Sequence, residues 1–380
     1  MHILIAPNAF KNSLSATDAA NAIHEGFKKS NLQFTSQCFP VGDGGDGTGE
    51  LIIKQLNGNV HNVEVHDPLG RIIQSSFGLI EEGATAVIEM ADASGLRLLS
   101  ASELSPLVTT SHGTGELIKH ALDRGVKKII LGIGGSATVD GGCGILSALG
   151  VRFLNSNGEE LPVAPKDMLD LAEIDSTGLD KRVFDCEITI LCDVDNKLTG
   201  KDGAAEVFGP QKGAGKNEVK ILDEVLSNFA AIAFQKTGKD LLSVCSGGAA
   251  GGTAAGLFGF LNARLVNGID YFLQLTDFDS VLKKSNLVIT GEGSIDEQTL
   301  NGKGPFGVAS RAKSNGIAVI GLAGKVPLHA NQNLQQYFDV LLSIGHEPGD
   351  LSSAISCSRE NLIRTAKELG NLLAINCDIK

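Results

Sequence analysis

The sequence predicts an α/β protein of two domains. Short apolar runs alternate with helical stretches near both ends of the 380-residue chain, a pattern typical of parallel-sheet units. The middle of the chain differs, because short alternating runs there are separated by turn signals. We therefore expect a discontinuous three-layer Rossmann-like domain, formed by residues 1–60 and 285–380. A mixed α/β domain of residues 61–284 is inserted into it, with the active site in the cleft between them.

The chain opens with a strand, a loop and a helix. The strand is expected at residues 2–6, and in the segment that follows Ser15 and Asp18 fit the N-cap and N3 positions of a helix. Apolar residues recur after them at helical spacing. A second strand near residues 34–41 leads into a glycine-rich loop, and residues 48–56 resume as helix.

The middle of the chain begins with an antiparallel meander at residues 59–91, where alternating runs such as NVHNVEV and RIIQSSFGLI flank the turn DPLG. Helix and strand then alternate again, with a helix near residues 113–124 and strands at 127–133 and 187–194. Three buried-type strands follow near the end, NLVITGE, IAVIGLAG and FDVLLSIG. A long helix at residues 352–375 completes the pattern.

Charge and cysteine content restrict the function classes. The chain has 44 acidic and 32 basic residues, and its net charge of −12 argues against duplex nucleic acid or an anionic membrane surface as the main partner. Seven scattered cysteines without a C-x-x-C pair are typical of a reduced protein. The first apolar run is too short for a signal segment, and no run approaches 18 apolar residues. We expect a cytoplasmic protein with no nucleic-acid or membrane partner.

The segment LGIGGSATVDGG, residues 131–142, is the first candidate binding loop. Gly132, Gly134 and Ala137 have the G-x-G-x-x-A spacing of a dinucleotide fingerprint after a strand. That fingerprint expects a helix directly after the third small residue, whereas Thr138 begins an extension of the loop. Glycine amides form anion-binding nests, so the alternative to nicotinamide binding or a plain turn is a phosphate site. The residues that would hold nucleotide phosphates are Gly134, Gly135, Ser136 and Thr138.

Two further segments carry acids at strand ends. PVGDGGDGTGE places Asp43 and Asp46 in a glycine-rich loop. Two such carboxylates could position a hydroxyl group or Mg²⁺, or could simply form turns, which Asp and Gly favour. LCDVDNKL places Asp193 at a strand end, where it could act as a base or metal ligand or form an Asx-turn.

Two segments combine lysine with strand or helix ends. In TGEGSIDEQTLNGKG, Glu292 and Asp296 follow a buried strand, and Lys303 lies between two glycines, where it can approach a polyphosphate. In PNAFKNSLSA, Lys11 and Ser13 precede a helix N-terminus, which attracts anions. Both segments could instead be solvated surface loops. The sequence contains neither a P-loop nor a protein-kinase signature, so phosphoryl transfer would need another kind of site.

Taken together, these motifs resemble the type 1 glycerate kinase family of bacteria. The likeness covers nearly the whole chain, through IAPNAFKNSLSA, VGDGGDGT, GIGGSATVDGG, LCDVDNKLTGKDGAAEVFGPQKGA, GGAAGGTAAGLFGF, TGEGSIDEQTLNGKGPFGVA and VIGLAGKV in that order. Where that family often has aspartate, serine and glycine, this chain has Asn8, Ala9 and Asn12, and Asp46 stands where glutamate is common.

The resemblance implies phosphorylation of D-glycerate by ATP with Mg²⁺, in two α/β domains. It favours 2-phosphoglycerate as the product, while 3-phosphoglycerate and a nicotinamide-dependent oxidoreductase using the GIGGSA loop are the alternatives. A homodimer is left open.

We combine the resemblance with the motifs into one hypothesis. Lys11 and Ser13 bind the glycerate carboxylate, and Asp43 and Asp46 lie near its hydroxyls. Mg²⁺ is held by Glu292 or Asp296, and Lys303 stabilises the transferring group. The first choice for the catalytic base is Asp193, and Asp43 is the second.

Overall fold

A computed structural model describes residues 1–329, 332–347 and 349–375. The fold is α/β, as expected, and it divides into two compact units. Unit 1 comprises Met1–Asp43 and Gly268–Lys380, and unit 2 comprises Gly44–Asn267. No helix within the described residues is both long enough and apolar enough to cross a membrane.

The division between the units falls at different positions from the expected 60/61 and 284/285. Helix α2 (Thr48–Gln55) packs on strands β4, β5 and β6 of unit 2, so it belongs to that unit. Helices α9 (Gly268–Leu275) and α10 (Phe278–Leu282) pack on each other, and α9 packs on α11 (Gly304–Ser314) of unit 1. The sequence pattern predicted α2 but did not indicate the sheet that it covers, and it did not predict α9 or α10.

Unit 1 is built on a parallel sheet. Its strands lie in the order β13-β12-β11-β1-β2, with all neighbours parallel. Their bounds are β1 His2–Ile5, β2 Thr35–Cys38, β11 Leu287–Ser294, β12 Ala318–Lys325 and β13 Val340–Ser343. The three apolar runs near the end of the chain are β11, β12 and β13, so the prediction of parallel strands there is confirmed. Strands β11 and β12 are mostly buried, as expected, whereas β13 lies at the edge of the sheet and is partly exposed.

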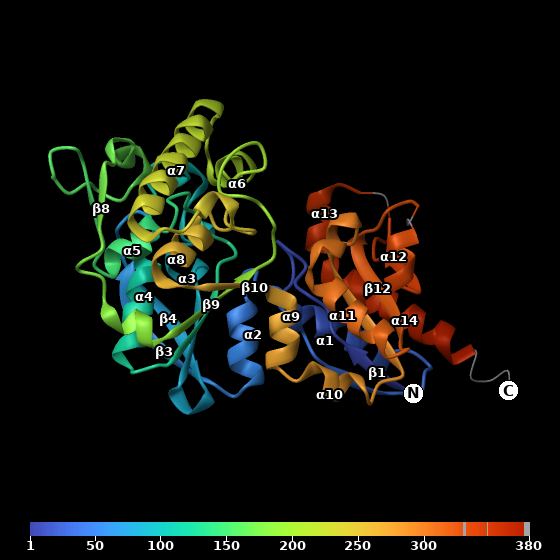
Figure 1. The fold of residues 1–380 in the computed structure, drawn as a ribbon. Coiled ribbons are helices and arrows are strands. Elements are labelled where there is room, and N and C mark those ends of the chain that lie inside the picture. The colour runs from blue at the N-terminus through green and yellow to red at the C-terminus, as the bar shows by residue number, and fades with distance from the viewer. Residues whose placement is uncertain (330–331, 348, 376–380) are drawn as a thin grey trace. The chain divides into compact units, whose positions relative to one another are not determined.

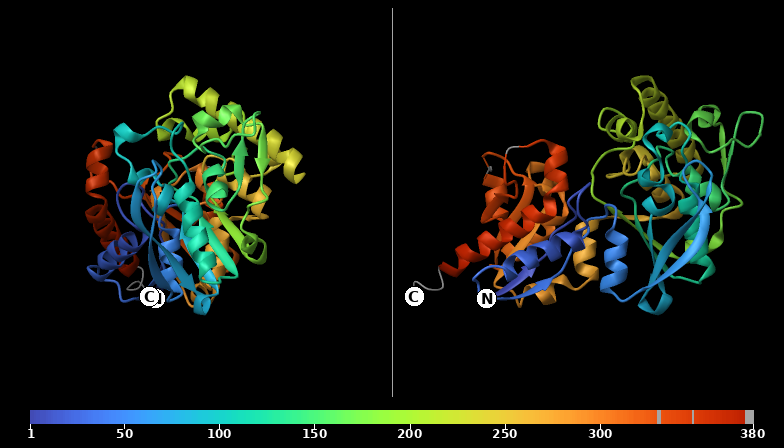
Figure 2. Two further views of the ribbon diagram at one scale, coloured as in Figure 1. Left: turned by 90° about the vertical axis from the view of Figure 1, so that its left-hand side faces the viewer. Right: turned by 180° about the vertical axis from the view of Figure 1, so that it is seen from behind.

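Helices cover both faces of the unit 1 sheet. Helices α1 (Ala16–Lys28) and α14 (Ser358–Ile375) pack against each other, and they bury Ile23 and Leu362 with Ile5 of the sheet. The right-hand view of Figure 2 shows these two helices side by side in front of the sheet, and Figure 1 shows α9 and α11 in front of the opposite face. The unit therefore has the three layers expected of a Rossmann-like fold.

Local signals at the helix ends of unit 1 agree in part with the structure. The Ser15 hydroxyl accepts a hydrogen bond from the Asp18 amide (3.1 Å), so the predicted N-cap of α1 is confirmed. The long helix predicted at residues 352–375 is instead two helices, α13 (Leu351–Ser356) and α14, separated by Cys357. The break coincides with a hydrogen bond from the Ser13 hydroxyl to the carbonyl oxygen of Ile355 (2.9 Å). The short α12 (Gln332–Tyr337) lies between β12 and β13 in the chain.

Unit 2 is built on a mixed sheet with strands in the order β10-β9-β6-β5-β4-β3. Strands β3, β4 and β5 form the predicted antiparallel meander, and β5, β6, β9 and β10 are parallel. The bounds are β3 Asn59–His66, β4 Ile72–Ile80, β5 Thr85–Glu89, β6 Lys128–Gly132, β9 Glu187–Cys192 and β10 Arg264–Asn267. A separate antiparallel pair is formed by β7 (Arg152–Leu154) and β8 (Glu173–Asp175).

The core of unit 2 joins one face of this sheet to several helices. Ile88 of β5 and Leu131 of β6 are buried with Leu117 of α4 and Phe229 of α7. Helices α4 and α5 lie side by side (Figure 1). The helix bounds are α3 Ala91–Ser94, α4 His112–Asp123, α5 Cys143–Ala148, α6 Ala204–Phe208, α7 Lys216–Thr237 and α8 Thr253–Leu261.

Candidate active site

The first set of predicted site residues lies at the carboxyl ends of the unit 1 strands. The chain leaves β1 toward β2 on one side, and β11 lies on the other side of β1. This reversal of strand order is the topological switch point, outside which open α/β sheets bind ligands. Asn8 and Lys11 follow β1 directly, and Glu292 lies near the end of β11. The topology therefore brings together residues that are almost 300 positions apart in the sequence.

Asp43 is held by the first loop and by a helix start. Its Oδ2 atom accepts hydrogen bonds from the Asn8 side-chain nitrogen (2.7 Å) and from the Gly304 amide (3.2 Å), and the residue is only 8% exposed. Gly304 is the first residue of α11, where helix amides lack partners within the helix and the dipole favours a negative charge. A Cβ atom at position 304 would lie 2.7 Å from the Asn8 side-chain nitrogen, so this contact requires glycine.

Glu292 is the second buried acid of this cluster. Burial raises the pKa of Glu292 to about 7, against the opposing effects of Lys303, a hydrogen bond from Thr299 and Lys11. The Thr299 hydroxyl donates to the Glu292 carboxylate (2.8 Å), and it accepts from the amide of Asp296 (3.2 Å). Because Asp43 also acts on the Glu292 pKa, all these charged groups lie within electrostatic reach of one another.

Ser13 has a structural contact in this unit. Its hydroxyl proton is directed at the Ile355 carbonyl, and Lys11 two residues earlier is exposed. The residue between them, Asn12, has a left-handed backbone with φ of 63°, a conformation that asparagine tolerates better than most side chains. Lys11 can therefore contact a ligand from its present position, whereas Ser13 connects the first loop to α13.

The second set of predicted residues lies in unit 2, in the loop that follows β6. A Cβ atom on Gly134 would lie 2.5 Å from the Cα of Gly45, and the Gly134 amide donates to the Gly44 carbonyl (3.2 Å). The glycine-rich loop thus packs directly against the segment that carries Asp46. Both segments need glycine where their backbones touch.

The middle of this loop presents backbone amides. Within residues 1–329, the amides of Gly135 and Ser136 have no protein acceptor, although the Gly135 carbonyl accepts from Leu96. Gly135 is exposed and has a φ of 70°, the left-handed conformation that occurs in anion-binding nests. The geometry is therefore that of a loop open to an anionic group.

A buried lysine holds the glycine-rich loop in place through two hydrogen bonds. Lys212 is 2% exposed, and its Nζ atom donates to the Ser136 hydroxyl (2.8 Å) and the Thr138 carbonyl (2.6 Å). Burial lowers the pKa of Lys212 to about 7, and Asp140 opposes this shift. The sequence analysis did not identify Lys212, although it precedes a glycine in GPQKGA, much as Lys303 does in NGKG.

The far end of the loop is fixed by Asp140. This carboxylate accepts from the amide and hydroxyl of Ser111 (2.8 and 2.7 Å) and from the amides of Gly142 and Gly144. Thr138 is fully buried and its hydroxyl has no hydrogen-bond partner. The place of Thr138 in the nucleotide site stays a prediction.

A third feature of unit 2 is a pocket beside Asp46. Glu89, the last residue of β5, accepts from the amides of Gly47 (3.1 Å) and Gly49 (2.5 Å), and burial raises its pKa to about 7. Asp46 itself is exposed and pairs with Arg97 (3.1 Å). The cavity has a volume of about 460 Å³ and includes Glu89 and Arg97 in its lining. Sequence analysis missed both residues, because the segments that contain them carry no motif.

Asp193 directly follows β9, which pairs with β6. It lies at the same edge of the sheet as the glycine-rich loop, and it is partly buried. Burial, with a further contribution from Asp193, raises the pKa of the neighbouring Cys192 thiol to about 12. Of the two predicted acids in unit 2, Asp46 lies in a glycine-rich loop, whereas Asp193 directly follows a central parallel strand.

The structure thus gathers Lys11, Asp43, Glu292 and Lys303 in unit 1, and it gathers Asp46 with the glycine-rich loop in unit 2. The hypothesis pairs Asp43 with Asp46 on one ligand, and the division between the units falls between Asp43 and Gly44; the pairing stays a prediction. The nicotinamide alternative lacks its required helix, because α5 begins at Cys143, well beyond Ala137.

These features define a class of protein before any comparison. Open amides in a glycine-rich loop, with acids and lysines at the carboxyl ends of parallel strands, supply the positioning and charge neutralisation that phosphoryl transfer needs. The fold and site are those of an α/β phosphotransferase without a P-loop.

The family model of the glycerate kinase family matches residues 3–374. Glycerate kinase of Bacillus subtilis (strain 168) is 45% identical over 97% of each chain, and glycerate 2-kinase of Escherichia coli (strain K12) is 42% identical over 99% of this chain and 98% of its own. A crystal structure from Salmonella typhimurium LT2, provisionally named glycerate kinase 2, covers all of both chains with a TM-score of 0.83 and 42% identity. The chain belongs to the glycerate kinase family and is an enzyme, a kinase that acts on glycerate.

Proposed function

We propose that this enzyme transfers the γ-phosphoryl group of ATP to the 2-hydroxyl of D-glycerate and forms 2-phosphoglycerate. The choice of hydroxyl is supported by the relative from Escherichia coli, which is named a glycerate 2-kinase and matches nearly the whole chain. The choice of ATP is supported by the kinase family and by the loop that follows β6.

The observation that carries the ATP assignment is the pair of amides at Gly135 and Ser136 that have no protein acceptor, in a loop whose Gly135 is exposed. Backbone donors in a glycine nest bind phosphate oxygens without a side-chain charge. Under this proposal Gly134 provides the close approach to the neighbouring loop, and Lys212 fixes the loop through Ser136.

Glycerate binding is assigned to the charged residues gathered in unit 1. Lys11 is exposed at the switch point and would pair with the glycerate carboxylate, while Lys303 would balance charge on the transferring group. Asp43, fixed by Asn8 and Gly304, would orient a substrate hydroxyl. Asp193 remains the first choice for the base.

Mg²⁺ fits the oxygen donors of unit 1. The Glu292 carboxylate is buried in β11, and Asp296 follows two residues after the end of that strand, so the donor set is one that Mg²⁺ prefers. When bound there, the ion would supply positive charge that offsets the charge of the phosphate groups. Thr299 holds Glu292 in place through its hydroxyl.

The product test is phosphorus NMR of a mixture of D-glycerate, ATP and Mg²⁺ with the enzyme. We expect ADP and a single 2-phosphoglycerate signal. A 3-phosphoglycerate signal would reassign the acceptor hydroxyl, and the absence of any phosphoglycerate would reject the substrate assignment. An NADH fluorescence titration in parallel should show no binding.

The carboxylate assignment is tested by Lys11→Ala. We expect a higher KM for glycerate, by about tenfold for the loss of one charged hydrogen bond, with the KM for ATP unchanged. Lys28→Ala is the matched control, because Lys28 is exposed in the last turn of α1. A rise confined to the KM for ATP would move Lys11 to the nucleotide.

A further inference from the structure

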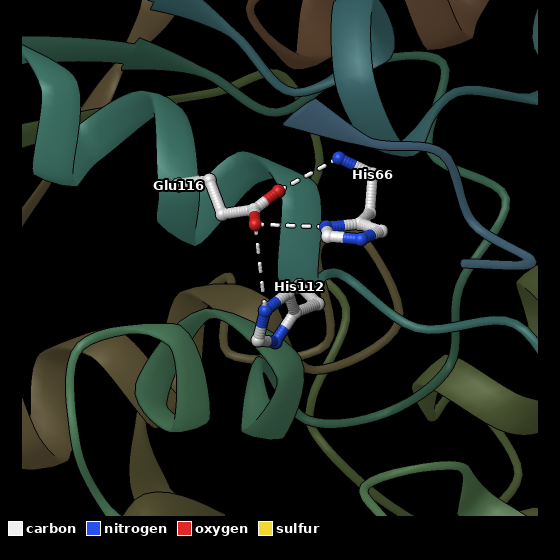
Figure 3. A group of neighbouring side chains, drawn as sticks. All are labelled: His66, His112 and Glu116. Atoms are coloured by element: carbon white, nitrogen blue, oxygen red, sulfur yellow. Dashed lines mark hydrogen bonds and ion pairs between the residues drawn. The ribbon is translucent and has the colours of Figure 1, made fainter. Parts of the chain in front are cut away.

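A group of metal-ligating side chains in unit 2 takes no part in the proposed reaction. His66, His112 and Glu116 each offer a ligand atom, and these atoms lie within 4.8 Å of one another. Figure 3 shows both imidazole rings directed at the Glu116 carboxylate. Its Oε1 atom is 2.8 Å from His66 Nδ1 and 3.7 Å from His112 Nε2.

Two elements fix these residues. His66 is the last residue of β3, and His112 and Glu116 lie one turn apart at the start of α4. The other carboxylate oxygen of Glu116 accepts the His66 amide (2.7 Å), which ties the helix to the strand. Gly113 packs so closely on the His66 carbonyl that a Cβ atom there would overlap it. The three ligands are therefore positioned by backbone packing rather than by flexible loops.

The chemistry of the donors selects a class of ion. Two imidazole nitrogens with one carboxylate oxygen are the ligands of zinc sites that keep an open position, whereas Mg²⁺ and Ca²⁺ prefer oxygen donors alone. The side chains remain 40%, 35% and 23% exposed for His66, His112 and Glu116, so an ion can reach them.

The spacing also suits such an ion. Ligand distances of about 2.0–2.2 Å in a tetrahedral site put neighbouring ligand atoms roughly 3.3–3.5 Å apart. The Glu116 to His112 distance of 3.7 Å is close to this value. The Glu116 to His66 distance of 2.8 Å, now a hydrogen bond, needs to lengthen by roughly half an ångström or slightly more to reach that spacing. Such a change is within the reach of side-chain rotation.

We propose that His66, His112 and Glu116 bind a first-row transition-metal ion of the zinc class. The site is separate from the acids assigned to Mg²⁺, none of which belongs to this group. An ion here would fasten the end of β3 to the start of α4. It would also lie one residue from Ser111, whose amide and hydroxyl hold Asp140 at the end of the glycine-rich loop.

Cobalt is the probe that tests the site directly. Full-length protein without a polyhistidine tag is stripped with a chelator and titrated with Co²⁺ in the absence of nucleotide. We expect one Co²⁺ per chain, with the visible absorption of a low-coordinate nitrogen and oxygen site, and displacement by one equivalent of Zn²⁺. Absence of saturable Co²⁺ binding, or a thiolate charge-transfer band that places the ion on a cysteine, overturns the proposal.

Variants assign the ligands. His66→Ala and His112→Ala should each weaken Co²⁺ binding by about 100-fold or more. Loss of a partner that only supports a ligand already costs up to about 100-fold, and these variants remove a ligand itself. His61→Ala is the control, because His61 lies on the same strand and stacks on Phe77 outside the group. Equal affinity in all three variants overturns the assignment.

Thermal unfolding provides a second readout. Zn²⁺ that binds only the folded state raises the Tm, so excess Zn²⁺ should stabilise the wild type and His61→Ala. It should not stabilise His66→Ala or His112→Ala, even if these variants start from a lower Tm. A Zn²⁺ shift of equal size in the histidine variants would count against the site.

Discussion

The two units each bury a glutamate at the end of a central strand, and their surroundings differ. Glu89 ends β5 of unit 2 and accepts two backbone amides, whereas Glu292 near the end of β11 in unit 1 has lysines and a threonine hydroxyl around it. Burial raises the pKa of both to about 7. The Glu89 carboxylate is thus held by backbone dipoles, with the charges of Asp46 and Arg97 nearby, whereas Glu292 is surrounded by lysine charges and a hydroxyl.

Under the proposed function, this difference matches a division of roles, with nucleotide binding in unit 2 and glycerate binding in unit 1. Neutral amides suit the phosphates of a nucleotide, because they bind anions without a competing side-chain charge. Lysines beside acids suit a small hydroxy acid and a metal ion, because each charge can be matched. Predictions that alter one unit at a time can therefore separate the two roles.

The largest expected effect comes from the acid that follows β9. If Asp193 takes the proton of the substrate hydroxyl, Asp193→Asn should lower kcat by about 10² to 10⁴ and change KM little. Steady-state kinetics with both substrates measures this. Asp195→Asn is the control at an exposed neighbouring position. An unchanged kcat in Asp193→Asn would transfer the role of base to Asp43, in unit 1.

The two glutamates can be compared through the pH dependence of stability. A carboxyl whose pKa is raised from 4.5 to about 7 by folding keeps its proton in the native state while the unfolded chain loses it. The free energy of unfolding should therefore fall as pH rises between these values, by at most about 3 kcal/mol for Glu89.

Glu89→Gln should remove that part of the fall, as measured by urea denaturation at pH 5 and pH 8. The exposed Glu206→Gln serves as the control and should behave as the wild type. If Glu89→Gln shows the full wild-type fall, burial does not hold the Glu89 proton. The same measurement on Glu292→Gln would show whether lysines screen the charge in unit 1 better than amides do in unit 2.

Substitutions in the glycine-rich loop of unit 2 test whether its backbone amides bind the nucleotide. Gly134→Ala places a methyl group 2.5 Å from the Cα of Gly45 and must push two backbones apart. Overpacking of this kind costs about 2 kcal/mol. If ATP binding has to return the displaced loop to its wild-type position, the KM for ATP should rise by up to roughly 30-fold, while the KM for glycerate is unchanged. Gly132→Ala is the control, because its Cβ would meet no atom closer than 3.8 Å. Equal KM values for ATP in the two variants would remove the loop from the nucleotide site.

The sequence predicted local features and the order of elements well. The cap at Ser15, the antiparallel meander and the parallel strands at both ends of the chain follow from patterns that extend over a few residues. It also indicated the loops that carry site residues, because glycine and acids after an apolar run are recognisable without tertiary contacts.

Long-range partners were not predictable in the same way. Asp43 and Gly304 are 261 residues apart and meet because β1 lies beside both β2 and β11. An aspartate at position 8 would have no proton to donate to Asp43 when ionised, so the role of Asn8 is visible only beside its partner. Helix α2 shows the same limit, because its pattern cannot say which sheet it covers.

Lys212 gives the smallest predicted effect and tests whether the loop of unit 2 acts through its backbone. The lysine reaches the Ser136 hydroxyl and the Thr138 carbonyl from a fully buried position and has no exposed surface for a ligand. Lys212→Met keeps most of the apolar stem but removes both hydrogen bonds, which should loosen the loop and raise the KM for ATP about tenfold. The kcat and the KM for glycerate should stay near the wild type, since the unit 1 charges are unaltered. Lys216→Met, at an exposed lysine four residues later, is the control. A fall in kcat without a change in the KM for ATP would mean that Lys212 supports the catalytic step rather than the nucleotide loop.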